Sequence, residues 1–244
     1  MAESKVPAAD QALRILNHLA TQRGPAPAAA IAAALSLPRS TTYQLLAVLI
    51  ERGFVVHLPE ERRYGLGIAA FELSSGFSRQ QPLARLGRPL VAALVDRLGE
   101  SGHLAVLHGR DVLYLVEERA PRRPSLVTDV GVRLPAQLTA SGRAMLAALP
   151  ASQLRALYPD RHEYAGLKRV LADVRAAGLA HEDGEVTPGL ASVGASVLDH
   201  LGWPAAAIAI TYASDAAIDR EAVAAGVTDA AAELSRRIGG GPRR

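Results

Sequence analysis

The 244-residue chain has no cysteine, few aromatic residues and only two lysines. The absence of cysteine excludes several kinds of site. Without cysteine there is no disulfide scaffold, no thiolate zinc or iron–sulfur site and no cysteine nucleophile. No stretch reaches the roughly 18–20 apolar residues of a membrane-spanning helix. The first ten residues, MAESKVPAAD, lack the basic flank and apolar stretch of a signal peptide. We therefore expect a cytoplasmic protein.

The charge balance says less about function than these absences do. Arginine supplies 25 of the 27 basic residues against 24 acidic residues, for a net charge of +3. Arginine forks suit phosphate and carboxylate recognition, but a bias toward arginine, alanine and glycine also follows from a GC-rich genome. Any claim of a nucleic-acid partner must therefore rest on local pattern.

The first 66 residues follow the pattern of a winged helix-turn-helix. We expect helices over 7–22 and 27–35, and a third from Arg39 that stops at Gly53. Two short strands, 54–58 and 63–66, flank a turn at 59–62. The first helix should bury Leu13, Leu16, Leu19 and Ala20, and the third Thr42, Leu45, Leu46 and Leu49.

Beyond this unit the pattern changes to strands mixed with helices. The expected helices cover 68–78, 83–98, 141–149, 168–177 and 219–238, and the expected strands 103–107, 112–118, 126–129, 179–182, 191–198 and 205–212. Such an order indicates an antiparallel or mixed sheet with helices on its faces. We expect an α+β protein with a winged helix at 1–66, a linking helix at 67–80 and a second domain at 81–244.

The polar face of the third helix is the candidate DNA reader, because the second helix of a helix-turn-helix enters the major groove. Glutamine can bond adenine, arginine can hold guanine or phosphate, and hydroxyls reach phosphates. The hairpin tip could touch an adjacent backbone. The candidate DNA-binding residues are Arg39, Ser40, Thr41, Tyr43, Gln44, Arg62 and Arg63. An ordinary solvated face, or a winged helix that docks a protein, would look similar.

Three ordered blocks resemble the isocitrate lyase regulator (IclR) family of bacterial transcription factors. They are LPRSTTYQLLAVLIERGFV with ERRYGLGIAAFEL, then HLAVLHGRDVLYLVE, then GVRLPAQLTASGRAMLAALP with GLAHEDGEVTPGLASVGASV. The resemblance covers roughly residues 8–238. It implies a winged helix, a linking helix and a GAF/PAS-like α/β domain that binds a small effector, in homodimers or dimers of dimers.

Carried over from the family, the effector-contacting positions are Leu134, Ala140, Ser141, Glu182, Ser192, Ala209 and Thr211. If Ala140 and Ser141 open a helix, their N–H groups favour an anion. The hydroxyls and Glu182 could bind a hydroxyl or N–H of the ligand. A small carboxylic acid or a hydroxylated aromatic compound fits this set.

The sequence departs from the family pattern in two regions. Ser36 stands where the family usually has glycine before the recognition helix, and Tyr43-Gln44 replaces a frequent His-Arg pair. Ala209 and Thr211 stand where the family often has two serines, which predicts a less polar pocket. The operator sequence and the identity of the effector therefore stay open.

An enzyme with an appended winged helix is the alternative function. The sequence shows no G-x-S-x-G elbow, H-E-x-x-H, Walker loop or G-x-G-x-x-G. His103 could reach the pocket, although a buried, hydrogen-bonded histidine is the simpler interpretation. The HEDGE segment at 181–185 offers possible zinc ligands, but a solvated acidic turn explains it as well. We expect no cofactor, no metal and no catalytic residue.

Overall fold

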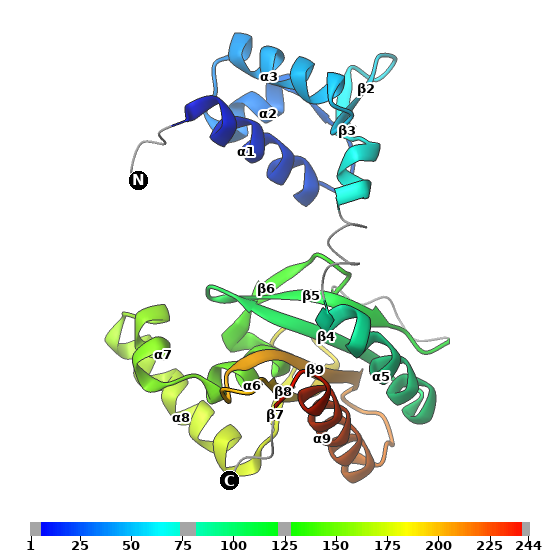
Figure 1. Cartoon of the computed structure of the whole chain (residues 1–244), viewed down its shortest axis with the longest axis vertical. Helices are drawn as coiled ribbons and strands as arrows, with labels where there is room; N and C mark the ends of the chain where they lie inside the picture. The colour runs from blue at the N-terminus through cyan, green and yellow to red at the C-terminus, as the bar shows by residue number, and fades with distance from the viewer. Residues whose placement is uncertain (1–5, 74–81, 122–127, 241–244) are drawn as a thin grey trace. The chain divides into compact units, whose positions relative to one another are not determined.

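The computed structural model describes residues 6–73, 82–121 and 128–240. The chain divides into two compact units, 1–80 and 81–244. Each unit has its own hydrophobic core and is described by itself (Figure 1).

The first unit is a winged helix. Its helices are α1 (Pro7–Thr21), α2 (Ala28–Leu35) and α3 (Arg39–Glu51), and its strands are β1 (Ala26–Pro27), β2 (Val55–Leu58) and β3 (Arg63–Leu66). The strands form an antiparallel sheet in the order β1-β3-β2. Residues 68–73 are helical, and the rest of the expected linking helix lies outside the described residues.

The buried face of α3 is confirmed, whereas that of α1 is confirmed only for Leu16 and Leu19. Thr42, Leu46 and Leu49 are buried and Leu45 is half-buried. In α1 the core residues are Ile15 and Leu19, while the expected Leu13 is 62% exposed and Ala20 is exposed too. Two overlapping stripes of helical period run along α1, and the packing of α2 and α3 against it selects the stripe that contains Ile15.

The second unit is built on one six-stranded antiparallel sheet in the order β6-β5-β4-β9-β8-β7. The strands are β4 (Ser101–His108), β5 (Asp111–Glu118), β6 (Arg133–Pro135), β7 (Ala180–Asp183), β8 (Leu190–Leu198) and β9 (Pro204–Ala213). The helices are α5 (Pro82–Leu98), η1 (Ala136–Leu138), α6 (Ala140–Ala148), α7 (Ala151–Leu157), α8 (Arg161–Ala177) and α9 (Arg220–Arg237).

Most of these elements were predicted, with three differences. Thr128 and Asp129 lie in no strand, and the rest of the expected strand 126–129 is outside the described residues. The edge strand is β6 instead. Helix α8 begins seven residues earlier than expected, where the Asp160 side chain caps it, and α7 was not predicted.

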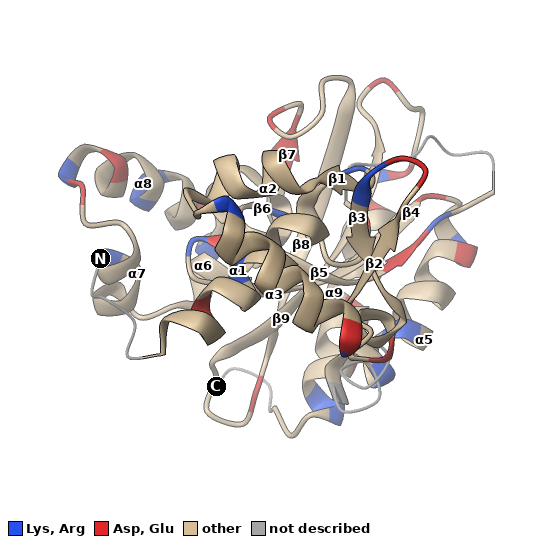
Figure 2. Ribbon diagram, turned by 90° about the horizontal axis from the view of Figure 1, so that it is seen from above, with Lys and Arg blue, Asp and Glu red and all other residues tan. Residues whose placement is uncertain are grey.

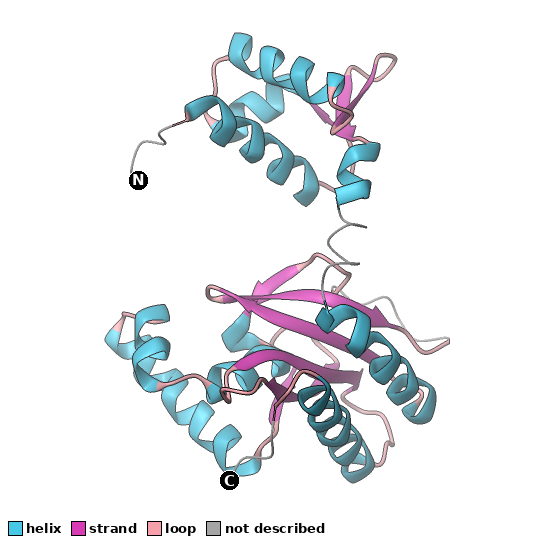
Figure 3. Ribbon diagram, in the orientation of Figure 1, coloured by secondary structure: helices cyan, strands magenta, loops and turns pink. Residues whose placement is uncertain are grey.

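Helices cover both faces of the sheet (Figures 1 and 3). Helices α5 and α9 share one hydrophobic core with the sheet, and α6, α7 and α8 share a second core with its other face. Alternate residues of each strand point to opposite faces. On β8, Ala191, Val193 and Ala195 therefore join the core of α5 and α9, and Ser192 and Gly194, which alternate with them, face the α6 side.

Candidate functional site

The outward face of α3 carries an exposed polar cluster. Arg39, Ser40, Tyr43 and Gln44 are exposed, and Thr41 is half-buried. The N-cap residue is Pro38, which makes no side-chain hydrogen bond to the first turn. The amide groups of that turn and their partial positive charge therefore remain available to an anion such as a DNA phosphate.

The hairpin of β2 and β3 places two arginines differently. Arg62 lies in the turn with a φ of +52°, a left-handed conformation that side chains other than glycine rarely adopt. The Arg63 guanidinium donates to the Pro25 carbonyl at 3.0 Å and so ties the hairpin to β1. The turn also contains Glu60 and Glu61, so both signs of charge meet at the tip (Figure 2).

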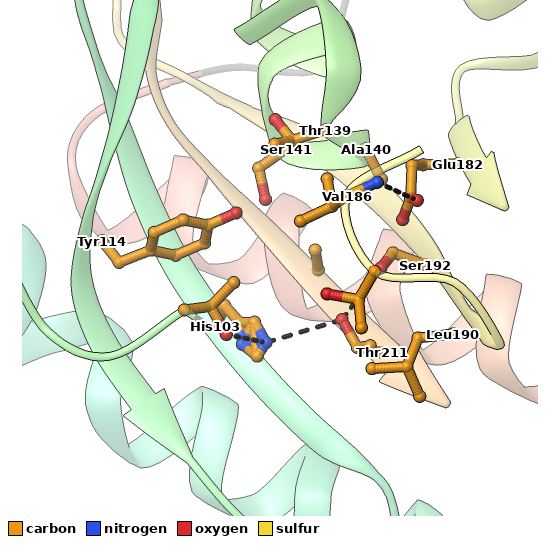
Figure 4. Close-up of a pocket in the computed structure, with 13 residues that line it drawn as sticks. His103, Tyr114, Thr139, Ala140, Ser141, Glu182, Val186, Leu190, Ser192 and Thr211 are labelled. Carbon is orange, nitrogen blue, oxygen red and sulfur yellow. Dashed lines mark hydrogen bonds between the residues drawn. The ribbon is translucent and has the colours of Figure 1, made fainter. Parts of the chain in front are cut away.

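A small cavity lies on the α6 side of the large sheet. It is lined by His103, Tyr114, Thr128, Thr139, Ala140, Ser141, Glu182, Val186, Thr187, Leu190, Ser192, Ala209 and Thr211 (Figure 4). Six of the seven sequence-predicted effector positions are in this set. Leu134 is not, because it lies on β6 and packs against the core of α6 and α8.

The first turn of α6 forms one side of the cavity. The Thr139 hydroxyl caps the helix by accepting from the Gly142 N–H at 2.9 Å. The backbone of β8 presses against this turn at Gly194, where a Cβ atom would lie 2.9 Å from the Ala140 carbonyl carbon. Only glycine allows this approach. The start of α6, with Ala140 and Ser141, is thus fixed at the cavity wall.

A chain of side-chain contacts forms a second side (Figure 4). Ser192 Oγ lies 2.9 Å from Thr211 Oγ1, which lies 3.5 Å from His103 Nε2. Thr128 Oγ1 lies 3.2 Å from the same nitrogen. Burial, and secondarily the nearby Arg119, lowers the pKa of His103 to about 4, so the imidazole is neutral near pH 7. Its Nδ1 atom is buried without a hydrogen-bond partner among the described residues.

Sequence reasoning left Tyr114, Thr128, Val186 and Thr187 out of the site. Tyr114 lies edge-on to His103, with ring centroids 5.6 Å apart. Burial, and then the Glu182 charge, raises the pKa of Tyr114 well above its ordinary value, so the phenol keeps its proton. The alternation of β5 could have indicated Tyr114. Nothing in the sequence pattern distinguishes Thr128, which lies outside any strand.

Glu182 is the one acidic residue among the described residues that line the cavity, and no lysine or arginine accompanies it there. One of its oxygens, Oε1, accepts from the N–H groups of Glu185 and Val186 at 2.8 and 3.1 Å. The sequence predicted a ligand contact for this carboxylate. The structure shows a structural role as well, since Oε1 of this carboxylate binds the backbone of the adjoining loop.

The structure can be searched for a metal site in the HEDGE segment and for a membrane-spanning helix. Within the described ranges, no group of three or more histidine, aspartate or glutamate residues is arranged to hold a metal ion, and this includes the HEDGE segment. His181 is exposed, and its carbonyl oxygen accepts from Arg143. None of the helices in the described part of the chain is both long and apolar enough to cross a membrane.

An exposed polar recognition helix in a winged fold, together with a separate sheet domain that contains a polar cavity, is typical of a DNA-binding regulator that responds to a small molecule. Residues 8–59 match the family described as "IclR helix-turn-helix domain", and residues 77–236 match "Bacterial transcriptional regulator IclR C-terminal". The chain belongs to the IclR family of bacterial transcriptional regulators.

Curated relatives cover nearly the whole chain. The HTH-type transcriptional regulator BhcR of Paracoccus denitrificans is 31% identical, over 97% of this chain and 88% of the relative. The transcriptional repressor IclR of Escherichia coli is 28% identical, over 86% and 81%.

Solved structures show the same fold. An IclR transcriptional regulator from Alicyclobacillus acidocaldarius superposes with a TM-score of 0.84 at 23% identity, over 97% of this chain and all of that one. An IclR homolog from Microbacterium hydrocarbonoxydans, solved in complex with 4-hydroxybenzoate, superposes with a TM-score of 0.82 at 20% identity, over 95% and 98%.

Proposed function

We propose that this regulator binds an operator through α3 and the β2–β3 hairpin, and that a small organic effector in the cavity changes its operator affinity. Gln44 would read a base, while Arg39, Ser40, Thr41, Tyr43 and Arg62 would contact phosphates or neighbouring base edges. Arg63 would act mainly by holding the hairpin to β1, given its bond to Pro25.

The observation that carries the effector proposal is the cavity itself, where the first turn of α6 faces the polar chain of His103, Thr211 and Ser192. Helix N-termini favour anions, so a carboxylate would bind at Ala140 and Ser141. A hydroxyl would bind at Ser192 and Thr211, which can both donate and accept. The complex of the Microbacterium homolog with 4-hydroxybenzoate, which carries both groups, supports this ligand class.

We infer that the protein acts by binding and not by turnover, in the cytoplasm. Its curated relatives are transcriptional regulators. His103 is neutral, and its Nε2 contacts two threonine hydroxyls that belong to the cavity wall. This arrangement would orient hydrogen bonds to a ligand, and among the described residues the other ring nitrogen, Nδ1, has no hydrogen-bond partner where a catalytic triad has its carboxylate.

A homodimer is the assembly that we propose, and pairs of dimers are compatible with it. Two winged helices would then meet two half-sites spaced by about one helical turn of DNA or a multiple. Ile68, Phe71 and Leu73 on the helical segment 68–73 are each more than 60% exposed. Large apolar side chains clustered on one short segment mark an interaction surface, which supports dimer contacts there.

Thr211→Val tests the effector site, because it keeps the shape of the side chain and removes its hydroxyl. We expect the variant to bind 4-hydroxybenzoate or another responsive acid about five- to tenfold more weakly, as one lost hydrogen bond predicts. Isothermal titration calorimetry measures this. Thr228→Val, on the exposed side of α9, is the matched control and should leave the affinity unchanged. Equal affinities of both variants and the parent would contradict the assignment.

A further inference from the structure

All of the residues that line the cavity are buried or half-buried. A ligand with a six-membered ring must therefore move part of the wall in order to enter. Most of the wall is sheet and helix, which resist displacement because they are packed on both sides.

The loop between β7 and β8, residues 184–189, is a part of the wall that lies outside sheet and helix, as Thr128 also does. Val186 and Thr187 line the cavity from this loop, and its residues Glu185, Pro188 and Gly189 are exposed to solvent. Gly184 and Gly189, at its two ends, have φ values of +76° and +82°. Glycine passes between left-handed and right-handed conformations more easily than other residues, so both ends of the loop can rotate.

Two carboxylates hold the loop in place, together with backbone hydrogen bonds at its ends, from the Gly184 N–H to the Leu190 carbonyl and from the Ser214 N–H to the Gly189 carbonyl. Glu182 accepts from the N–H groups of Glu185 and Val186, as described above. Glu185 in turn accepts from the Arg143 guanidinium at 2.6 Å through one oxygen, and from the Asp183 N–H at 3.0 Å through the other. Charge-assisted hydrogen bonds of this kind are the strong ones.

Arg143 is the anchor on the side of α6. Its side chain is only 11% exposed, and it also donates to the carbonyl oxygens of Gln137 and His181 at 2.8 Å each. Its bonds to Gln137 and His181 are to backbone atoms of rigid elements, so they survive a movement of the loop. The bond to Glu185 is the one that would have to break.

We propose that residues 184–189 form a lid over the effector cavity, held closed by the Arg143–Glu185 ion pair and by Glu182. Arg143, Glu182 and Glu185 are positioning residues of this lid. Ligands enter when the ion pair opens and the loop rotates about Gly184 and Gly189. The proposal rests on the proposed function for what passes the lid, but the lid itself can be measured without any ligand.

The absence of cysteine from the chain allows a direct test. Ser192→Cys places a single thiol on the cavity wall at a half-buried position, and methyl methanethiosulfonate, a small neutral reagent, labels it faster when the lid is open. Mass spectrometry of the full-length protein follows the labelling rate. Adding Glu185→Gln removes the charge of the ion pair at nearly constant shape, and we expect labelling to become about tenfold faster.

Two control variants and a second reporter make the result specific. Ser152→Cys, exposed on α7, should label rapidly and at the same rate with or without Glu185→Gln. Glu233→Gln, which disrupts ion pairs on α9 far along the chain, should leave the labelling rate of the Ser192→Cys protein unchanged. Ala209→Cys is a second reporter on the cavity wall, should Ser192→Cys reduce the melting temperature.

The lid is contradicted if the cavity thiol labels as fast as the one at position 152, because the cavity is then open already. It is also contradicted if Glu185→Gln leaves the rate at both cavity reporters unchanged. These outcomes are independent of the proposed effector, since no ligand is present. If instead the lid opens as expected and no organic acid binds, the proposed function fails and the lid stands.

Discussion

Ser36 shows how a single residue carries strain within the winged helix. It ends α2 with a φ of 55° and a ψ of 41°, in the left-handed conformation. Residues other than glycine adopt this conformation at a penalty of roughly 1–2 kcal/mol. The family pattern usually has glycine here, and the geometry gives the physical reason. The sequence identified the departure, and the structure shows that Ser36 itself takes the left-handed conformation.

Ser36→Gly should therefore stabilise the first unit. Part of the gain is lost because glycine is more flexible in the unfolded chain, so we expect the free energy of unfolding to rise by about 0.5–1 kcal/mol. Urea denaturation followed by circular dichroism measures it. Ser40→Gly, at an exposed position within α3, is the opposite control and should destabilise by roughly 0.5–1 kcal/mol. An unchanged or lower stability of Ser36→Gly would contradict the strain at this position.

His103 predicts a pH dependence of stability. Its pKa is about 4 in the folded protein, because of burial first and of Arg119 second, and near 6.5 when unfolded. Between these values the unfolded chain binds the proton and the folded one does not, so stability falls as pH drops from 6.5 towards 4. The contribution is on the order of 3 kcal/mol. His103→Gln should flatten this part of the pH–stability curve in urea titrations. An identical curve for the variant would show that His103 is not the group responsible.

At the scale of elements, what the sequence predicts depends on length and periodicity. Helix α3 was predicted with its buried face because Thr42, Leu45, Leu46 and Leu49 follow one helical stripe, although Val48 and Ile50 outside this stripe are apolar too. Helix α1 has two competing stripes, and only its packing partners decide between them. Strand β1 has two residues and β6 three, which is too short for any alternation to be visible.

In the candidate site, too, residues on regular elements were easier to predict than residues in loops. Positions on regular elements, such as Ser192 and Thr211, were placed by the resemblance and lie on the cavity wall. The structural role of Glu182 was not predicted, since its partners are backbone N–H groups in an irregular loop. No periodicity describes such a loop, and only coordinates show where its amides point.

The recognition helix and the hairpin should respond differently to substitution. Gln44→Ala removes a base contact, so it should relax base preference and cost about 1–3 kcal/mol on the preferred operator. Arg62→Ala removes a phosphate contact, so it should weaken all DNA sequences alike and lower the salt slope by about one. Fluorescence anisotropy against an operator and its single-base variants, at several salt concentrations, separates the two. An unchanged ranking of operator variants with Gln44→Ala would contradict the base-reading role.

At the scale of the whole molecule, regulation requires that the two units communicate. An effector can change operator affinity only if it binds two states of the protein with different affinity. A coupling free energy of about 1–3 kcal/mol, typical of allosteric pairs, changes operator affinity roughly 5–150-fold. By reciprocity, DNA must change the affinity for the effector by the same factor. The direction of the change is left to experiment.

The central claim is that one chain both binds an operator and senses a small organic acid. The most direct test is an anisotropy titration of the protein against the DNA upstream of its own gene, at two salt concentrations. The titration is repeated with a panel of small carboxylic acids and hydroxylated aromatic compounds. We predict specific, salt-dependent binding that at least one compound shifts about fivefold or more, and that Thr211→Val makes less sensitive to that compound. DNA binding that no compound changes would contradict the proposed effector sensing. A lack of specific binding to the flanking DNA would contradict the proposed operator binding.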